Sequence, residues 1–168
     1  MICKLRSWHM KDAPALASLL SNPNILRNLR DGIPFPYTQA DAADYISSVL
    51  SADSHKNFSF AITVDDELVG SIGAFRQENI HYRTAELGYY IAEPHWGEGI
   101  GTAAVTQLCD TLFSNTDILR IFAEPFAHNA ASCRVLEKAG FSFEGTLRKN
   151  AVKNNTVIDM KMYARIKE

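Results

Sequence analysis

Residues 84 to 123 read in order as a strand, a glycine-rich turn, a helix and a second strand. Thr84–Ile91 has the alternation of a strand, and helical spacing of apolar residues follows from about Gly101 to Ser114. Ile118–Ala123 then has the composition of a buried strand. A helix between two strands is the usual connection of parallel neighbours in one sheet. This unit predicts a mixed α/β sheet.

The rest of the chain adds strands and helices to this unit. Strict alternation predicts a hairpin of strands at 58–64 and 68–75. Further strands are expected at 2–8, 141–147 and 156–164, and further helices after the capping residues Asp12, Asn22, Thr38 and Asn129. With 168 residues, 46% of them hydrophobic, one domain spanning 1–168 is expected.

Charge and cysteine content exclude several classes of protein. The 17 basic and 19 acidic residues give a net charge of -2, which argues against direct binding to nucleic acid or anionic membrane. No apolar run approaches the roughly 20 residues of a membrane span, and no signal-peptide block is present, so a soluble, unexported protein is expected. Cys3, Cys109 and Cys133 lack zinc-ligand spacing, which favours a reducing cytoplasm and no metal site.

The turn His95–Thr102 contains three glycines directly before a helix. Glycine lets the backbone turn sharply, and the first N–H groups of a helix have no partner within it. Together with the positive end of the helix dipole, these donors favour an anion, and a pyrophosphate fits better than a carboxylate. The alternative is a flexible turn without a ligand.

Two other phosphate sites compete for the same turn. A nucleotide-triphosphate loop needs a lysine that this turn lacks. Gly99–Ala104 satisfies the dinucleotide fingerprint, and Glu124 follows at the distance of a ribose-binding acid. One feature argues against the dinucleotide site. In the fingerprint the first glycine follows its strand at once, whereas Pro94–Trp96 separates Ile91 from Gly97 here.

Three segments carry a resemblance to a known family. These are Glu86–Ile91, Trp96–Ala103 and Asn129–Phe141. Together they resemble the GNAT superfamily of N-acetyltransferases, and within it the branch of ribosomal-protein-alanine N-acetyltransferases. The resemblance implies a mixed, mostly antiparallel twisted sheet, flanked by helices, whose central parallel strands splay apart. It also implies acetyl-CoA as the donor and an amine as the acceptor.

The same resemblance assigns the residues that hold acetyl-CoA. The turn and the start of the helix would bind the pyrophosphate through backbone N–H groups, and the strand before the turn would contact pantetheine through its backbone. Trp96 stands where other members often have Gln or Arg, but it fits this branch. The implied cofactor residues are Tyr90, Ile91, Trp96, Gly97, Glu98, Gly99, Ile100, Gly101, Thr102, Asn129 and Ser132.

Acetyl transfer to an amine needs a route for the proton of the amine and a proton for the leaving thiolate. Glu86 lies on the strand beside the implied thioester and is the candidate base, although a carboxylate paired with an arginine would look the same in sequence. The tyrosine that many members use as the acid is missing between Asn129 and Phe141. Ser132 resembles the acid of this branch, or it bonds locally within its helix.

Acceptor specificity is expected from the loop Asn28–Tyr37, from the helix after it and from the hairpin after Leu147. Arg30, Phe35 and Tyr37 are the candidate substrate-binding residues. Some ribosomal-protein acetyltransferases use a carboxylate where this chain has Ala151, which weakens the case for a ribosomal acceptor. The chain is expected to be a monomer or a homodimer.

The leading hypothesis is an acetyl-CoA-dependent N-acetyltransferase acting on a peptide N-terminus or a small-molecule amine by direct attack in a ternary complex. A non-catalytic acyl-CoA-binding module is the main alternative, because the usual tyrosine is missing and the base is unassigned. A dinucleotide-binding oxidoreductase is the more remote one.

Overall fold

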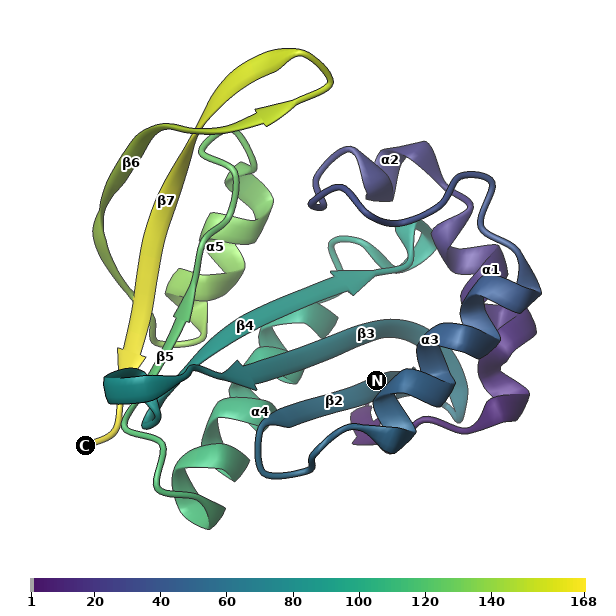
Figure 1. The fold of residues 1–168 in the computed structure, drawn as a ribbon, viewed down its shortest axis with the longest axis horizontal. Coiled ribbons are helices and arrows are strands. Elements are labelled where there is room, and N and C mark those ends of the chain that lie inside the picture. Colours follow the sequence, from purple (N-terminus) through teal and green to yellow (C-terminus); the bar gives the residue numbers. More distant parts are fainter. Residues whose placement is uncertain (1) are drawn as a thin grey trace.

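The computed structural model describes residues 2–168 and contains one seven-stranded sheet in the order β1-β2-β3-β4-β5-β7-β6 (Figure 1). Every neighbouring pair is antiparallel except the central pair, β4 and β5. The mixed, mostly antiparallel sheet with one parallel pair is therefore confirmed. The strands are β1 (Cys3–Arg6), β2 (Asn57–Val64), β3 (Glu67–Arg76), β4 (Thr84–Ile91), β5 (Arg120–Ala123), β6 (Ser142–Lys153) and β7 (Thr156–Ile166).

Helices cover both faces of the sheet. The helices α1 (Ala13–Leu20), α2 (Pro23–Leu26) and α3 (Gln39–Ser51) form one apolar cluster with the sheet, and α4 (Ile100–Asn115) and α5 (Ala130–Lys138) belong to the other. Short 3₁₀ turns at Met10–Asp12, Asn79–His81 and Glu93–His95 complete the element order. Over residues 2–168, no helix is both long and apolar enough to cross a membrane.

The parallel strands β4 and β5 pair over only three residues at their start. The register joins Thr84 to Arg120, Ala85 to Ile121 and Glu86 to Phe122. Beyond Glu86 the two strands diverge, which Figure 1 shows as an opening that widens toward α5 and α2. The second half of β4 therefore has a hydrogen-bonding edge that β5 does not cover.

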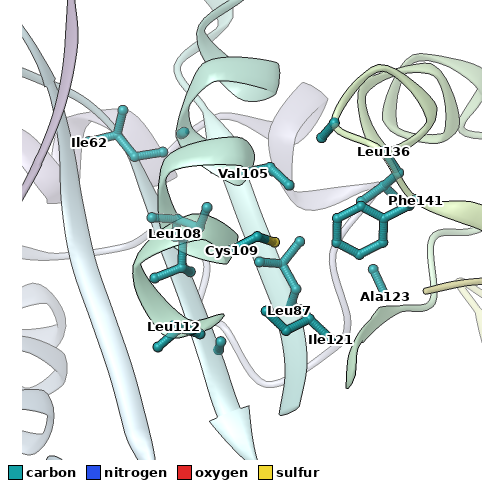
Figure 2. Close-up of a cluster of buried hydrophobic side chains, with 14 of the residues drawn as sticks. Ile62, Leu87, Val105, Leu108, Cys109, Leu112, Ile121, Ala123, Leu136 and Phe141 are labelled. Carbon is teal, nitrogen blue, oxygen red and sulfur yellow. The ribbon is translucent and has the colours of Figure 1, made fainter. Parts of the chain in front are cut away.

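The main core lies between α4 and the sheet (Figure 2). Val105, Leu108 and Leu112 recur along one face of α4 and are buried against β4 and β5. Leu87 and Ile121 meet them from those two strands. The apolar face that the sequence predicted for this helix is confirmed. Because this face packs on β4 and β5, it holds the start of α4 in place beside the diverging strands.

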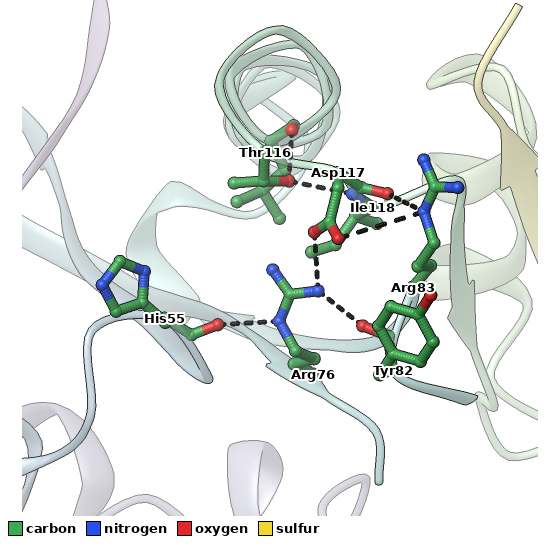
Figure 3. A network of polar contacts seen from close by, with 8 residues as sticks. His55, Arg76, Tyr82, Arg83, Thr116, Asp117 and Ile118 are labelled. Carbon is green, nitrogen blue, oxygen red and sulfur yellow. Dashed lines mark hydrogen bonds and ion pairs between the residues drawn. The ribbon is translucent and has the colours of Figure 1, made fainter. Parts of the chain in front are cut away.

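A polar network holds the two central strands together at their paired end (Figure 3). The guanidinium of Arg76 donates to the carbonyl of His55 at 2.8 Å and to Asp117 Oδ1 at 2.9 Å. Arg83, the residue before β4, donates from Nε to the carbonyl of Asp117 at 2.7 Å. The Leu119 amide donates back to the Arg83 carbonyl at 2.8 Å. These bonds fix the end from which β4 and β5 diverge.

The C-terminal hairpin is longer than the sequence predicted. The strand expected at 141–147 continues to Lys153 as β6, and its pairing with β7 shifts register between Phe143 and Gly145 and again between Leu147 and Ala151. Lys149 has a positive φ of 54° within the second irregularity. Such bulges insert unpaired residues and hide the two-residue alternation from which a strand is recognised.

Asp12 has a different role from the predicted helix cap. It makes no side-chain capping bond to α1. Its carboxylate instead accepts two hydrogen bonds from the Arg6 guanidinium, at 2.8 and 2.9 Å, and one from the His9 amide at 2.9 Å. These bonds and the nearby Arg6 charge outweigh burial and lower the pKa of Asp12. Asp12 therefore ties β1 to the segment before α1.

The Asp12→Asn variant is expected to lower the free energy of unfolding at neutral pH by about 1–3 kcal/mol, because a mostly buried charged acceptor is lost. A carboxyl whose pKa is lowered by folding stabilises the protein above its unfolded pKa, near ~3.9, and loses that contribution as the pH falls through its folded pKa. Urea unfolding of both proteins at several pH values measures this. A difference that stayed constant from about pH 7 to pH 3 would contradict the ionic role.

Candidate functional site

A cavity of about 820 Å³ lies between the diverging halves of β4 and β5. Its walls come from both strands, from the turn before α4, from α5 and from the segment around α2. Arg134 and Lys138 line the cavity together with the turn, whereas Glu86 and Glu124 line it where the strands begin to diverge. The cavity thus combines an anion-binding turn with a pair of carboxylates.

The glycine-rich turn supplies a backbone cradle at the start of α4. Gly97 and Gly99 have positive φ angles of 78° and 80°, which side chains rarely adopt, and no atom lies within 4 Å of a Cβ built on either one. Gly99 is the N-cap and has no side chain to cap the helix. The amides of Ile100–Thr102 lie in the first turn, where a helix provides no partner. The site fits a pyrophosphate, which needs several such donors at once.

The side chains around the turn favour the same kind of ligand. Arg134 and Lys138 on α5 line the cavity and add positive charge, a contribution that the sequence analysis missed. Glu98, predicted as a cofactor residue, is outside the cavity wall, and its carboxylate lies 3.4 Å from His95 Nδ1. Glu98 therefore keeps its negative charge away from the anion site, and its amide alone remains available to a phosphate.

Trp96 lines the cavity and also fixes the end of β4. Its indole Nε1 donates to the Ile91 carbonyl at 2.8 Å. Tyr90 and Ile91 line the cavity as well. The Tyr90 ring packs against the cluster under α1 and α3, and burial raises the pKa of its hydroxyl. Trp96 and Ile91 thus meet at the edge of β4 that β5 leaves uncovered, whereas the Tyr90 main chain pairs with Ser71 of β3.

Asn129 and Ser132 meet at the start of α5. Asn129 Oδ1 accepts a bond from the Ser132 amide at 3.2 Å, so it is the predicted helix cap. Ser132 Oγ lies 3.1 Å from the hydroxyl of Tyr89, and all three residues line the cavity. Burial raises the pKa of Tyr89 to about 12. A phenol on β4 therefore stands beside the serine, although the sequence showed no tyrosine on α5.

Glu86 projects into the cavity from β4 and is paired with an arginine. Arg30 Nη2 donates to Glu86 Oε2 at 2.8 Å and lies 3.4 Å from Glu124 Oε2. Burial and the neighbouring Glu86 charge raise the pKa of Glu124, and Arg30 opposes them. Glu124 follows β5 directly, and Glu86 is the last residue of β4 that pairs with β5, so one guanidinium bridges the two strands where they begin to diverge. The sequence alone predicts Glu124 only as a ribose-binding acid.

The predicted acceptor residues separate in the structure. Arg30 lines the cavity, whereas the exposed Phe35 and the buried Tyr37 are outside its walls. A second cavity of about 310 Å³ adjoins it and shares Arg30 and Glu124 in its wall. Lys153 of the hairpin lines that second cavity and forms an ion pair of 2.7 Å with Asp31. Other apolar residues line the larger cavity near Arg30, among them Ile25, Leu29, Ile33 and Phe75.

Comparison with known proteins gives a consistent result. Residues 3–142 match the family model described as Acetyltransferase (GNAT) domain. The uncharacterized N-acetyltransferase p20 of Bacillus licheniformis is 30% identical over 167 residues, which cover 97% of this chain and 92% of p20. The ribosomal-protein-serine acetyltransferase of Escherichia coli strain K12 is 34% identical over 107 residues, which cover 64% of this chain and 59% of that one.

A solved structure agrees with these sequence matches. It is the ribosomal L7/L12 alpha-N-protein acetyltransferase RimL in complex with coenzyme A. The two structures superpose with a TM-score of 0.87 at 25% identity, covering 98% of this chain and 93% of that one.

Proposed function

This chain belongs to the acetyltransferase (GNAT) family, and we propose that it transfers the acetyl group of acetyl-CoA to a peptide N-terminus or a small-molecule amine. The observation that carries the acceptor side of this proposal is the single cavity that joins the glycine-rich turn to Glu86 and Glu124. One end suits a pyrophosphate and the other suits an ammonium group. An N-acetyltransferase has to bring these two chemistries together.

The donor is acetyl-CoA, which supplies the acetyl group as a thioester whose C–S bond breaks as the C–N bond to the amine forms. In our proposal the amides of Gly97–Thr102 hold its pyrophosphate, with Arg134 and Lys138 adding positive charge. The uncovered edge of β4 near Ile91 and the side-chain Nδ2 of Asn129 contact the pantetheine arm. Trp96 supports this edge through its bond to the Ile91 carbonyl.

Three groups move protons in this proposal. Glu86, directly or through a water molecule, accepts the proton that the acceptor amine loses. Ser132 donates the proton that the leaving thiolate takes up, and the Tyr89 hydroxyl at 3.1 Å resupplies the serine. Tyr89 is protonated at neutral pH because the ordinary pKa of a tyrosine is about 10, and burial raises the pKa of this phenol further, to about 12. The pair thus takes the place of the tyrosine that α5 lacks.

The proposed setting follows from the same relatives. We infer one acetyltransferase domain over residues 1–168, acting in the cytoplasm, where the unpaired Cys3, Cys109 and Cys133 remain reduced. The names of the relatives favour a protein N-terminus as acceptor. Ala151 lies in the wall of the smaller cavity and offers no carboxylate to such an acceptor, so a small-molecule amine is retained as the second candidate.

Calorimetric titration with acetyl-CoA, with NADH as the control, tests the donor, and thiol release with a panel of peptides and amines tests the acceptor. Micromolar acetyl-CoA binding and amine-dependent thiol release are expected, with no NADH binding. The Ser132→Ala variant should lower kcat about tenfold and leave acetyl-CoA affinity within about twofold. Acetyl-CoA binding without turnover on any amine would favour a non-catalytic acyl-CoA-binding module.

A further inference from the structure

Arg30 occupies the place where an acceptor ammonium would be expected. Its Nη2 lies 2.8 Å from Glu86 Oε2 and 3.4 Å from Glu124 Oε2. The Glu86 and Glu124 side chains are only 24% and 20% exposed, so both need a cation. A primary ammonium carries three N–H donors and can satisfy the same two carboxylates.

The arginine itself is weakly held. Its side chain is 62% exposed and comes from the irregular segment between α2 and α3. Its two carboxylate contacts both use the same nitrogen, Nη2, whereas a strong arginine pair uses two parallel N–H bonds. Ion pairs in which one side chain is this exposed add little stability. A competing cation can therefore displace the guanidinium toward solvent at little cost.

The surroundings of this position limit what the acceptor carries beside its amine. Leu29, Ile33 and Phe75 give the cavity an apolar wall. A Cβ built on Gly88, in the same wall and two residues from Glu86 along β4, meets no atom within 4 Å. The space beside Gly88 can therefore hold a group of the acceptor, and the apolar wall favours an uncharged one. A carboxylate beside the amine would instead face Glu86 and Glu124.

We propose that the acceptor ammonium replaces the Arg30 guanidinium between Glu86 and Glu124, so the preferred acceptor is a primary amine flanked by uncharged, apolar groups. Arg30 is then an internal competitor of the acceptor. This inference rests on the proposed acetyltransferase function and names its substrate class. It differs from the sequence-based expectation, in which Arg30 binds the substrate.

The test uses phenylalaninamide and phenylalanine, which differ in the group beside the amine. Each is titrated into the protein saturated with coenzyme A, so binding is measured without turnover, and KM is measured in parallel with acetyl-CoA. The wild type is expected to bind the amide at least tenfold tighter than the amino acid. The Arg30→Gln variant should bind the amide about three- to tenfold tighter than the wild type, because the competitor is gone.

The matched control is Arg27→Gln, which removes the same charge from an exposed residue outside both cavities. Equally tighter binding of the amide to both variants would attribute the effect to net charge and overturn the proposal.

Weaker binding of the amide to the Arg30→Gln variant would show that Arg30 holds the acceptor. If the wild type bound phenylalanine more tightly than phenylalaninamide, the proposed substrate class would be excluded. If acetyl-CoA binds but neither compound does, the proposed acceptor position between Glu86 and Glu124 is wrong. Loss of acetyl-CoA binding would instead refute the acetyltransferase proposal.

Discussion

Replacing Gly99 with valine is expected to weaken acetyl-CoA binding about 100-fold, or about 3 kcal/mol. Gly99 has a φ of +80°, where a side chain costs roughly 1–2 kcal/mol per residue and a β-branched one is an outlier. The turn will relax to avoid this strain. The amides of Ile100–Thr102 then lose their common direction, and each charge-assisted bond lost costs about 1.5–3 kcal/mol.

Calorimetric titration with acetyl-CoA measures the effect, and Gly32→Val is the matched control. Gly32 also has a positive φ, of 114°, with no neighbour within 4 Å of a built Cβ, but it is far from the turn in sequence and outside the cavity wall. The control should keep its acetyl-CoA affinity within about twofold while losing similar stability. Equal affinity in Gly99→Val and wild type would remove the turn from the donor site.

The Glu86→Gln variant is expected to lower kcat at about pH 7 by roughly 100-fold, within the range for loss of a positioned base. Acetyl-CoA affinity should remain within about twofold, because Glu86 lies away from the turn. The loss should shrink as the pH rises past about 8, the usual pKa of an α-amino group, since the acceptor is then already neutral.

A pH–rate series of Glu86→Gln and wild type with one peptide acceptor gives this comparison. Glu144→Gln serves as the control, because Glu144 is also paired with an arginine, Arg120, at 2.6 and 2.9 Å, but lies outside both cavities. Its kcat should match the wild type. A deficit in Glu86→Gln that is the same at about pH 7 and pH 9.5 would assign Glu86 to positioning instead of proton transfer.

Local patterns predicted the glycine-rich turn and the elements on either side of it. The turn and the apolar face of α4 each depend on residues that are neighbours in sequence, and so does the projection of Glu86 from one face of β4. Short-range spacing determines such features. The glycines at 97 and 99 were identifiable because few other residues accept their backbone angles.

Contacts between elements that are distant in sequence were not predictable in the same way. Glu86 meets Arg30 across 56 residues, and Tyr89 meets Ser132 across 43. Both pairs depend on where the segment after α2 and the helix α5 lie relative to β4, which no local pattern encodes. Phe35 and Tyr37 were chosen as acceptor residues for their aromatic rings, but the backbone carries them outside the cavity. The hairpin of β6 and β7 was underestimated because its bulges interrupt the alternation.

The order of the binding elements along the chain has a consequence for how such proteins diversify. The proposed donor contacts, from Tyr90 to Lys138, come from one continuous middle segment of the chain. The network around Arg76 and Asp117 anchors β4 and β5 at their paired end. The apolar residues that line the larger cavity near Arg30 come largely from the N-terminal part, and the smaller cavity takes Lys153 from the C-terminal hairpin. Recombination or drift at the two ends of the gene can therefore change which amine is accepted, while the inherited acetyl-CoA site remains intact.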